Sequence, residues 1–188
     1  MVDYRRLVHR IPGRFRGTRV YRSTPTDAMN RRSIKKYAAF NRFIAAVIKV
    51  LLNRFGACVI YDIHSYNIKH QVDKGHPSPP MFNLGTLGIQ RNQWKRPIAA
   101  WLDHLRQIKI PELPTTIAEN DVFGGMGEFC IRLTGWDANI LVLPTEISKF
   151  YMDEHSGIVY DSLVHALKKE VAMAVTAHGG EFQRYYCR

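Results

Sequence analysis

The chain has 188 residues, a formal net charge of +11 at pH 7, 46% hydrophobic residues and 23% charged residues. Such a composition is ordinary for one globular domain with a substantial core, and it excludes a low-complexity chain. Cys58, Cys130 and Cys187 are widely separated and show no CxxC or CxxH spacing, which excludes a disulfide scaffold and a zinc finger. We therefore expect a reducing compartment, with the cytoplasm as the default location. No run reaches about 18 apolar residues, so no membrane partner is expected.

The positive charge is concentrated at the N-terminal end. Up to residue 54 there are fourteen lysines and arginines against Asp3 and Asp27, whereas the rest of the chain carries 13 basic and 14 acidic residues. Such a segment is typical of a solvated arm and the outer face of a helix, and it could also attract nucleic acid or an acidic partner. No RNA- or DNA-binding motif accompanies it, so nucleic acid is the least favoured partner.

The first elements are predicted as an arm and a helix. Residues 1–32 are rich in glycine, proline and arginine without apolar periodicity, which predicts a basic irregular arm. From Ser33, a plausible N-cap, apolar residues recur at three- and four-residue steps to Phe55, which predicts a helix. Residues 33–188 are predicted to form a single α/β domain.

A buried strand is predicted directly after Gly56. The run from Ala57 to Tyr61 is almost wholly apolar, as in a parallel strand that is buried on both faces. Asp62 and His64 follow at its C-terminal end, where α/β sheets place ligand sites, and they are two residues apart and so share one side. Asp62 could orient His64 or bind a ligand beside it. A capped strand end with a hydrogen-bonded histidine fits the spacing equally well.

The remaining elements alternate between helix and strand, which is typical of an α/β fold. In chain order we predict a loop over 67–80, an extended piece over 81–86, a helix over 88–108 that starts or kinks near Pro97, a strand over 115–119, a glycine-rich loop over 120–127, strands over 128–133 and 139–143, and a helix over 160–177. Glu146 is predicted just beyond the end of the 139–143 strand. On spacing alone it could equally be a surface carboxylate paired with Lys149.

Five short segments, in the same order, resemble the N-formylglutamate amidohydrolase family, which is related to the zinc carboxypeptidases. They are Asp62–Asn67, Phe82–Thr86, Glu119–Gly125, Thr145–Lys149 and Phe150–Glu154. The resemblance implies a three-layer α/β/α sandwich of the phosphorylase/hydrolase-like, zinc-carboxypeptidase-like kind. It also implies zinc-dependent hydrolysis of a formamide or similar amide bond on an acidic amino acid. The expected partner is thus a small molecule with a carboxylate and an amide.

The resemblance also implies roles for individual residues. His64 would be a zinc ligand, and Glu146 would be the general base that takes a proton from water. Asp62 and Ser65 would support these two residues. The segments that resemble the substrate side contain Asn83, Asn120, Phe123, Gly124 and Gly125.

The chain departs from the family pattern in its metal ligands. The family takes its first two ligands from a histidine and a glutamate upstream, whereas His9 is the only histidine before His64 and no glutamate precedes Glu112. The expectation is therefore a member that lacks N-terminal strands and two of three ligands, binds zinc poorly and hydrolyses little. The alternatives are an inactive binding module and, least favoured, a basic nucleic-acid-associated protein. His70, His76 and the HxxE pair His178 and Glu181 are further ligand candidates.

Overall fold

The computed structural model describes residues 14–15, 18–19 and 23–188, which fall into two compact units, residues 1–50 and 51–188. In the first unit, strands β1 (Arg14–Phe15) and β2 (Thr18–Arg19) pair antiparallel. Helix α2 (Asp27–Phe55) begins six residues before the predicted start at Ser33, because the Thr26 hydroxyl accepts a hydrogen bond from the Met29 backbone N–H (3.3 Å) and so caps the helix. The predicted arm thus ends earlier than residue 32, and the rest of it lies mostly outside the described residues.

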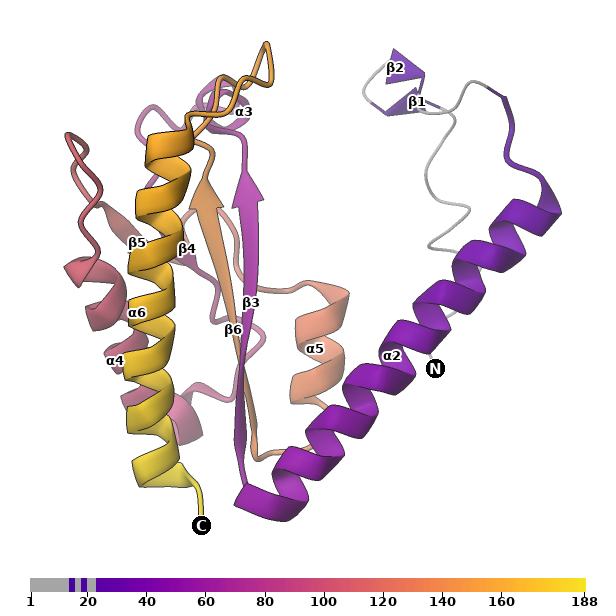
Figure 1. The fold of residues 1–188 in the computed structure, drawn as a ribbon, viewed down its shortest axis with the longest axis vertical. Helices are drawn as coiled ribbons and strands as arrows, with labels where there is room; N and C mark the ends of the chain where they lie inside the picture. Colours follow the sequence, from indigo (N-terminus) through magenta and orange to yellow (C-terminus); the bar gives the residue numbers. More distant parts are fainter. Residues whose placement is uncertain (1–13, 16–17, 20–22) are drawn as a thin grey trace. The chain divides into compact units, whose positions relative to one another are not determined.

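The second unit is built on a four-stranded mixed sheet in the order β3-β6-β4-β5 (Figure 1). Its strands are β3 (Cys58–Tyr66), β4 (Phe82–Leu84), β5 (Ile117–Glu119) and β6 (Ile140–Ser148). β3 runs parallel to β6, β4 runs antiparallel to β6, and β5 runs parallel to β4. The predicted short strands at 81–86 and 115–119 are confirmed.

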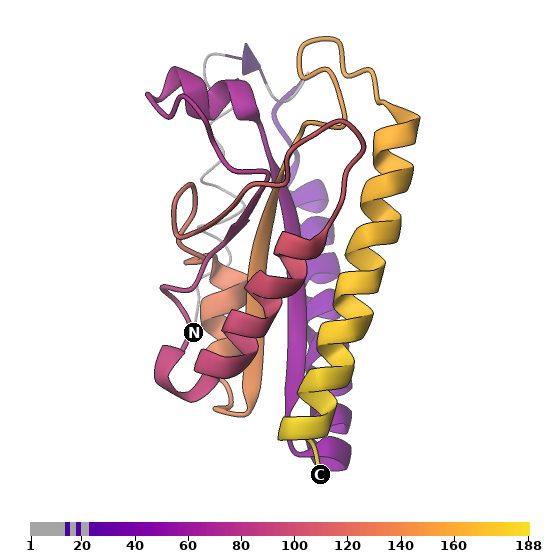
Figure 2. The ribbon, with the colours of Figure 1, turned by 90° about the vertical axis from the view of Figure 1, so that its left-hand side faces the viewer.

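Helices cover both faces of this sheet. α4 (Arg91–Gln107) and α6 (Asp161–Tyr186) pack on one face, which Figure 2 shows toward the viewer, and α5 (Glu128–Thr134) lies on the other. This arrangement confirms the predicted three-layer α/β/α sandwich. None of the helices among the described residues is long and apolar enough to cross a membrane.

The core lies between the sheet and the pair α4 and α6. The ring of Trp101 is fully buried, and its indole N–H donates to the Thr145 hydroxyl (2.9 Å). α4 is kinked at Trp94, three residues before Pro97, as the proline predicted. α6 continues past its predicted end at residue 177 because Phe182, farther along, is buried in the same core.

Several other predicted elements were wrong. β3 was expected to be buried on both faces, but within the described sheet it is an edge strand, and the Ile63 side chain is 40% exposed. The predicted strand at 128–133 is helix α5, a short apolar run of the kind whose type periodicity cannot decide. The predicted loop at 67–80 contains helix α3 (Ile68–Asp73), whose first N–H groups bond the Glu154 carboxylate at 2.5 and 3.3 Å. That cap comes from a distant part of the chain, so local sequence does not show it.

Candidate functional site

A row of polar side chains crosses the sheet from β3 to β4. His64 is aligned with Glu146 in the parallel register, and Asn83 is aligned with Glu146 in the antiparallel register. Residues that are aligned on neighbouring strands point to the same face of a sheet. The structure therefore brings His64, Glu146 and Asn83 together on one face. The sequence had predicted Glu146 just beyond the end of a strand. In the structure β6 is longer, and Glu146 lies inside it.

Asp62 and His64 form a hydrogen-bonded pair on this face. The His64 Nε2 atom lies 2.8 Å from Asp62 Oδ1, which confirms that the two side chains share one side of β3. The Asp62 side chain is 19% exposed and the His64 side chain 55%, so the carboxylate holds an imidazole that faces solvent. The pair lies on the side of the sheet that α5 covers. Burial, and secondly the charge of Asp62, raise the pKa of the Cys130 thiol on α5 to about 11.

Glu146 is partly buried, and its pKa is raised above the ordinary value of a glutamate. Burial is the largest cause, the Asp62 charge raises the pKa further, and His64 acts in the opposite direction. A carboxyl group that is poised in this way beside an oriented histidine is suited to accept and return a proton.

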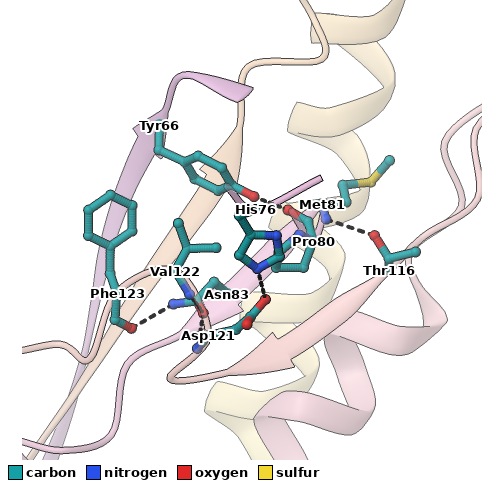
Figure 3. Close-up of polar contacts among 9 residues, drawn as sticks. All are labelled: Tyr66, His76, Pro80, Met81, Asn83, Thr116, Asp121, Val122 and Phe123. Carbon is teal, nitrogen blue, oxygen red and sulfur yellow. Dashed lines mark hydrogen bonds and ion pairs between the residues drawn. The ribbon is translucent and has the colours of Figure 1, made fainter. Parts of the chain in front are cut away.

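Asn83 is fully buried and holds the loop that follows β5 (Figure 3). Its side-chain oxygen accepts hydrogen bonds from the backbone N–H groups of Asp121 (2.9 Å) and Val122 (3.0 Å), and its Nδ2 atom donates to the Phe123 carbonyl (2.8 Å). The Asn83 amide is thus engaged within the protein.

Asn120 is engaged in a similar way. Its Oδ1 atom accepts from the Thr86 N–H (2.6 Å), and its Nδ2 atom donates to the Thr86 hydroxyl (2.8 Å). The Asn120 backbone adopts a positive φ of 59°. Of the residues that were expected on the substrate side, Phe123 keeps an accessible ring, 38% exposed and in edge contact with Tyr66 at a centroid distance of 5.8 Å.

Gly124 and Gly125 pack against the chain that follows β4. The Gly124 carbonyl accepts from the Leu87 N–H (2.9 Å). Gly125 has a φ of +73°, and a Cβ atom there would lie 2.6 Å from the Gly85 carbonyl oxygen. The close crossing of two backbones therefore requires a glycine at position 125, whatever that residue contacts in a ligand.

This crossing predicts a large difference between two neighbouring glycines. Gly125→Ala is expected to lower the free energy of unfolding by about 3 kcal/mol, because it combines a positive φ with a backbone clash. Gly127→Ala is the matched control: no atom lies within 4 Å of its Cβ position and its φ is −64°, so, even as the N-cap of α5, it should lower stability by less than about 1 kcal/mol. Urea unfolding curves measure both, and equal stabilities would contradict the prediction.

Tyr66 and Asp121 belong to the same face, and sequence reasoning did not single them out. The Tyr66 hydroxyl donates to the Pro80 carbonyl, and its pKa is raised by burial, by Asp121 and by Glu146 while Ser148 lowers it. Both residues lay inside the segments that carried the family resemblance. The alternation of β3 could have placed Tyr66 beside His64.

The other predicted residues lie elsewhere. Ser65 alternates to the opposite face, where it lines a cavity of about 580 Å³ with residues that include Val164 and Leu167 of α6.

His178 is fully buried among core residues: its Nδ1 atom is 2.6 Å from the Tyr61 hydroxyl and its Nε2 atom is 2.8 Å from the Pro97 carbonyl. Burial lowers the pKa of His178. Glu181 pairs with His104 at 3.0 Å, so the HxxE pair is not at the His64 site.

The zinc ion that the resemblance implies would need three protein ligands on this face. Among the described residues, no three histidine, cysteine, aspartate or glutamate side chains cluster closely enough to hold a metal ion. His64 is the residue of the described face that matches a zinc ligand of the family pattern, and His9 lies outside the described residues. The described residues alone therefore do not fit a three-ligand zinc site.

Comparison with known proteins gives a consistent picture. The family described as N-formylglutamate amidohydrolase matches residues 5–152. No curated protein matches the chain. Among solved structures, the chain is similar to the N-formylglutamate amidohydrolase from Ralstonia eutropha JMP134, with a TM-score of 0.64 and 18% sequence identity. The alignment covers 87% of this chain and 59% of that one.

Proposed function

Since the chain belongs to the N-formylglutamate amidohydrolase family, we propose that it hydrolyses a formamide or similar amide bond on an acidic amino acid. The family resemblance that the five segments predicted is confirmed by the match over residues 5–152. The reaction would take place at the sheet face that carries His64 and Glu146. The observation that carries the proposal is the alignment of Glu146 with His64, together with the raised pKa of Glu146.

The proposed chemistry follows from the positions of these side chains. Glu146 takes a proton from the attacking water and passes it to the departing amine, which is the usual work of a general base that becomes a general acid. His64, held by Asp62, borders the same reaction space and can hydrogen-bond the attacking water or the substrate carbonyl. Phe123 offers an apolar wall for the substrate. Because the described residues do not fit the zinc site that the resemblance implies, no proposed step runs through a metal.

A second candidate function is that of a binding module without turnover. It is favoured by one observation: of the three zinc ligands in the family pattern, only His64 has a match in this sequence. A small-molecule ligand with a carboxylate and an amide would be the partner in either case. The cytoplasmic location and the absence of a nucleic-acid partner stay predictions.

The test is to measure binding and hydrolysis in one experiment. The chain is titrated with N-formyl-L-glutamate by calorimetry, with and without added Zn²⁺, and formate release is followed by NMR. We expect saturable binding and formate release above the uncatalysed background. Binding without formate would assign the chain to the second candidate, and the absence of binding would contradict both.

A further inference from the structure

His76 and Asp121 form a hydrogen-bonded pair beside the polar row, 45 residues apart in the sequence (Figure 3). The His76 Nε2 atom lies 2.8 Å from Asp121 Oδ2. We propose that His76, held by Asp121, recognises the side-chain carboxylate of the substrate and so sets the preference for acidic amino acids. This inference rests on the proposed function.

The pair is mounted rigidly with respect to Glu146. The backbone N–H of Asp121 is bonded to the buried side chain of Asn83, and Asn83 is aligned with Glu146 across the sheet. The charges of Asp121 and Glu146 both raise the pKa of the Tyr66 hydroxyl, so both carboxylates lie on the Tyr66 side of the sheet. A ligand group bound by His76 would thus lie at a fixed place relative to the proposed base.

One ring atom of His76 has no hydrogen-bond partner. Among the described residues, the Nδ1 atom of His76 is the only buried side-chain nitrogen or oxygen that lacks one. Buried polar atoms are normally satisfied, so an exception in a native structure calls for an explanation, and a ligand oxygen would supply one. A protonated imidazole donates at both nitrogens, so with Nε2–H on Asp121 the Nδ1–H is left for a ligand oxygen.

The ring borders solvent although Nδ1 is screened. The His76 side chain is 29% exposed, and Figure 3 shows the ring between Asp121 and Pro80, next to the Tyr66 hydroxyl. The Tyr66 hydroxyl donates a hydrogen bond to the Pro80 carbonyl in this part of the site. A ligand carboxylate would reach Nδ1 after a small movement of these neighbours.

Three other cationic side chains of the described residues 51–188 are already engaged. Arg132 pairs with Glu128 on its own helix at 2.9 Å. Arg91 pairs with Glu119, and the Lys149 ammonium donates to the Asn67 side chain at 2.7 Å. His76 is therefore the better candidate for a substrate carboxylate.

The experiment compares two probes that differ only in charge. N-formyl-L-glutamate and N-formyl-L-glutamine have nearly the same shape, and both are titrated calorimetrically into the chain. The unmodified protein should prefer the glutamate probe by about tenfold or more, as expected for a charge-assisted hydrogen bond. His76→Gln should bind both probes within about twofold of each other. His165→Gln, at an exposed position on α6, is the control and should keep the preference.

A second readout separates recognition from a structural role. In protein with ¹⁵N-labelled histidine, the Nδ1 resonance of His76 should shift with the glutamate probe and stay in place with the glutamine probe. Retention of the preference in His76→Gln, or an unmoved Nδ1 resonance, would overturn the inference. Equal binding of both probes by the unmodified chain would overturn the inference alone, whereas binding of neither would overturn the proposed function.

Discussion

Replacing Glu146 by glutamine is expected to lower formate release by about 10²–10⁴-fold while affinity for N-formyl-L-glutamate changes little. Glutamine keeps the size and hydrogen-bonding capacity of the side chain but cannot accept the proton of the attacking water. Glu146 lies beside His64 on the polar face. Because the substitution removes only the group that accepts the proton, it should affect turnover and not binding. Formate release and calorimetric affinity, measured on the same preparation, separate the two effects.

The pH dependence gives this prediction a second test. Glu146 must be deprotonated to act as a base, so the rate should rise with pH as the group loses its proton. Burial raises the pKa of Glu146, so the rising limb should lie above the value of about 4.3 for an ordinary glutamate. Glu112→Gln, at an exposed position, is the control and should leave rate and profile unchanged. Equal rates for Glu146→Gln and the unmodified chain would contradict the assigned role.

Replacing Asn83 by alanine is expected to lower the free energy of unfolding by about 3 kcal/mol. The substitution removes three hydrogen bonds at a fully buried position and leaves the N–H groups of Asp121 and Val122 without their partner. The loop that carries Asp121 should loosen with it. Urea unfolding measures the stability, and faster amide hydrogen exchange at Asp121 and Val122 would locate the change.

The control for this substitution is Asn92→Ala. Asn92 is exposed on α4, so its loss should change stability by less than about 0.5 kcal/mol. If Asn83→Ala were as stable as Asn92→Ala, the amide of Asn83 would not be holding the loop.

The sequence predicted those features that depend on short-range pattern. The kink of α4 follows from Pro97, and the shared side of Asp62 and His64 follows from the alternation of a strand. The predictions of a loop at α3 and of a fully buried β3 were wrong, because both features depend on distant parts of the chain. α3 is capped by Glu154, and β3 is half-exposed because in the described sheet it pairs on one side only.

By itself, the sequence determined the family of this protein and the α/β class of its fold, because short motifs in a fixed order and local periodicity are properties of the chain alone. Only the tertiary structure decided which polar groups are available to a ligand. It engages the Asn83 amide with the loop after β5 and pairs His76 with Asp121, leaving Nδ1 of that histidine without a partner. The physical reason is that hydrogen-bond partners are set by strand register and loop crossings between segments tens of residues apart, which no local pattern encodes.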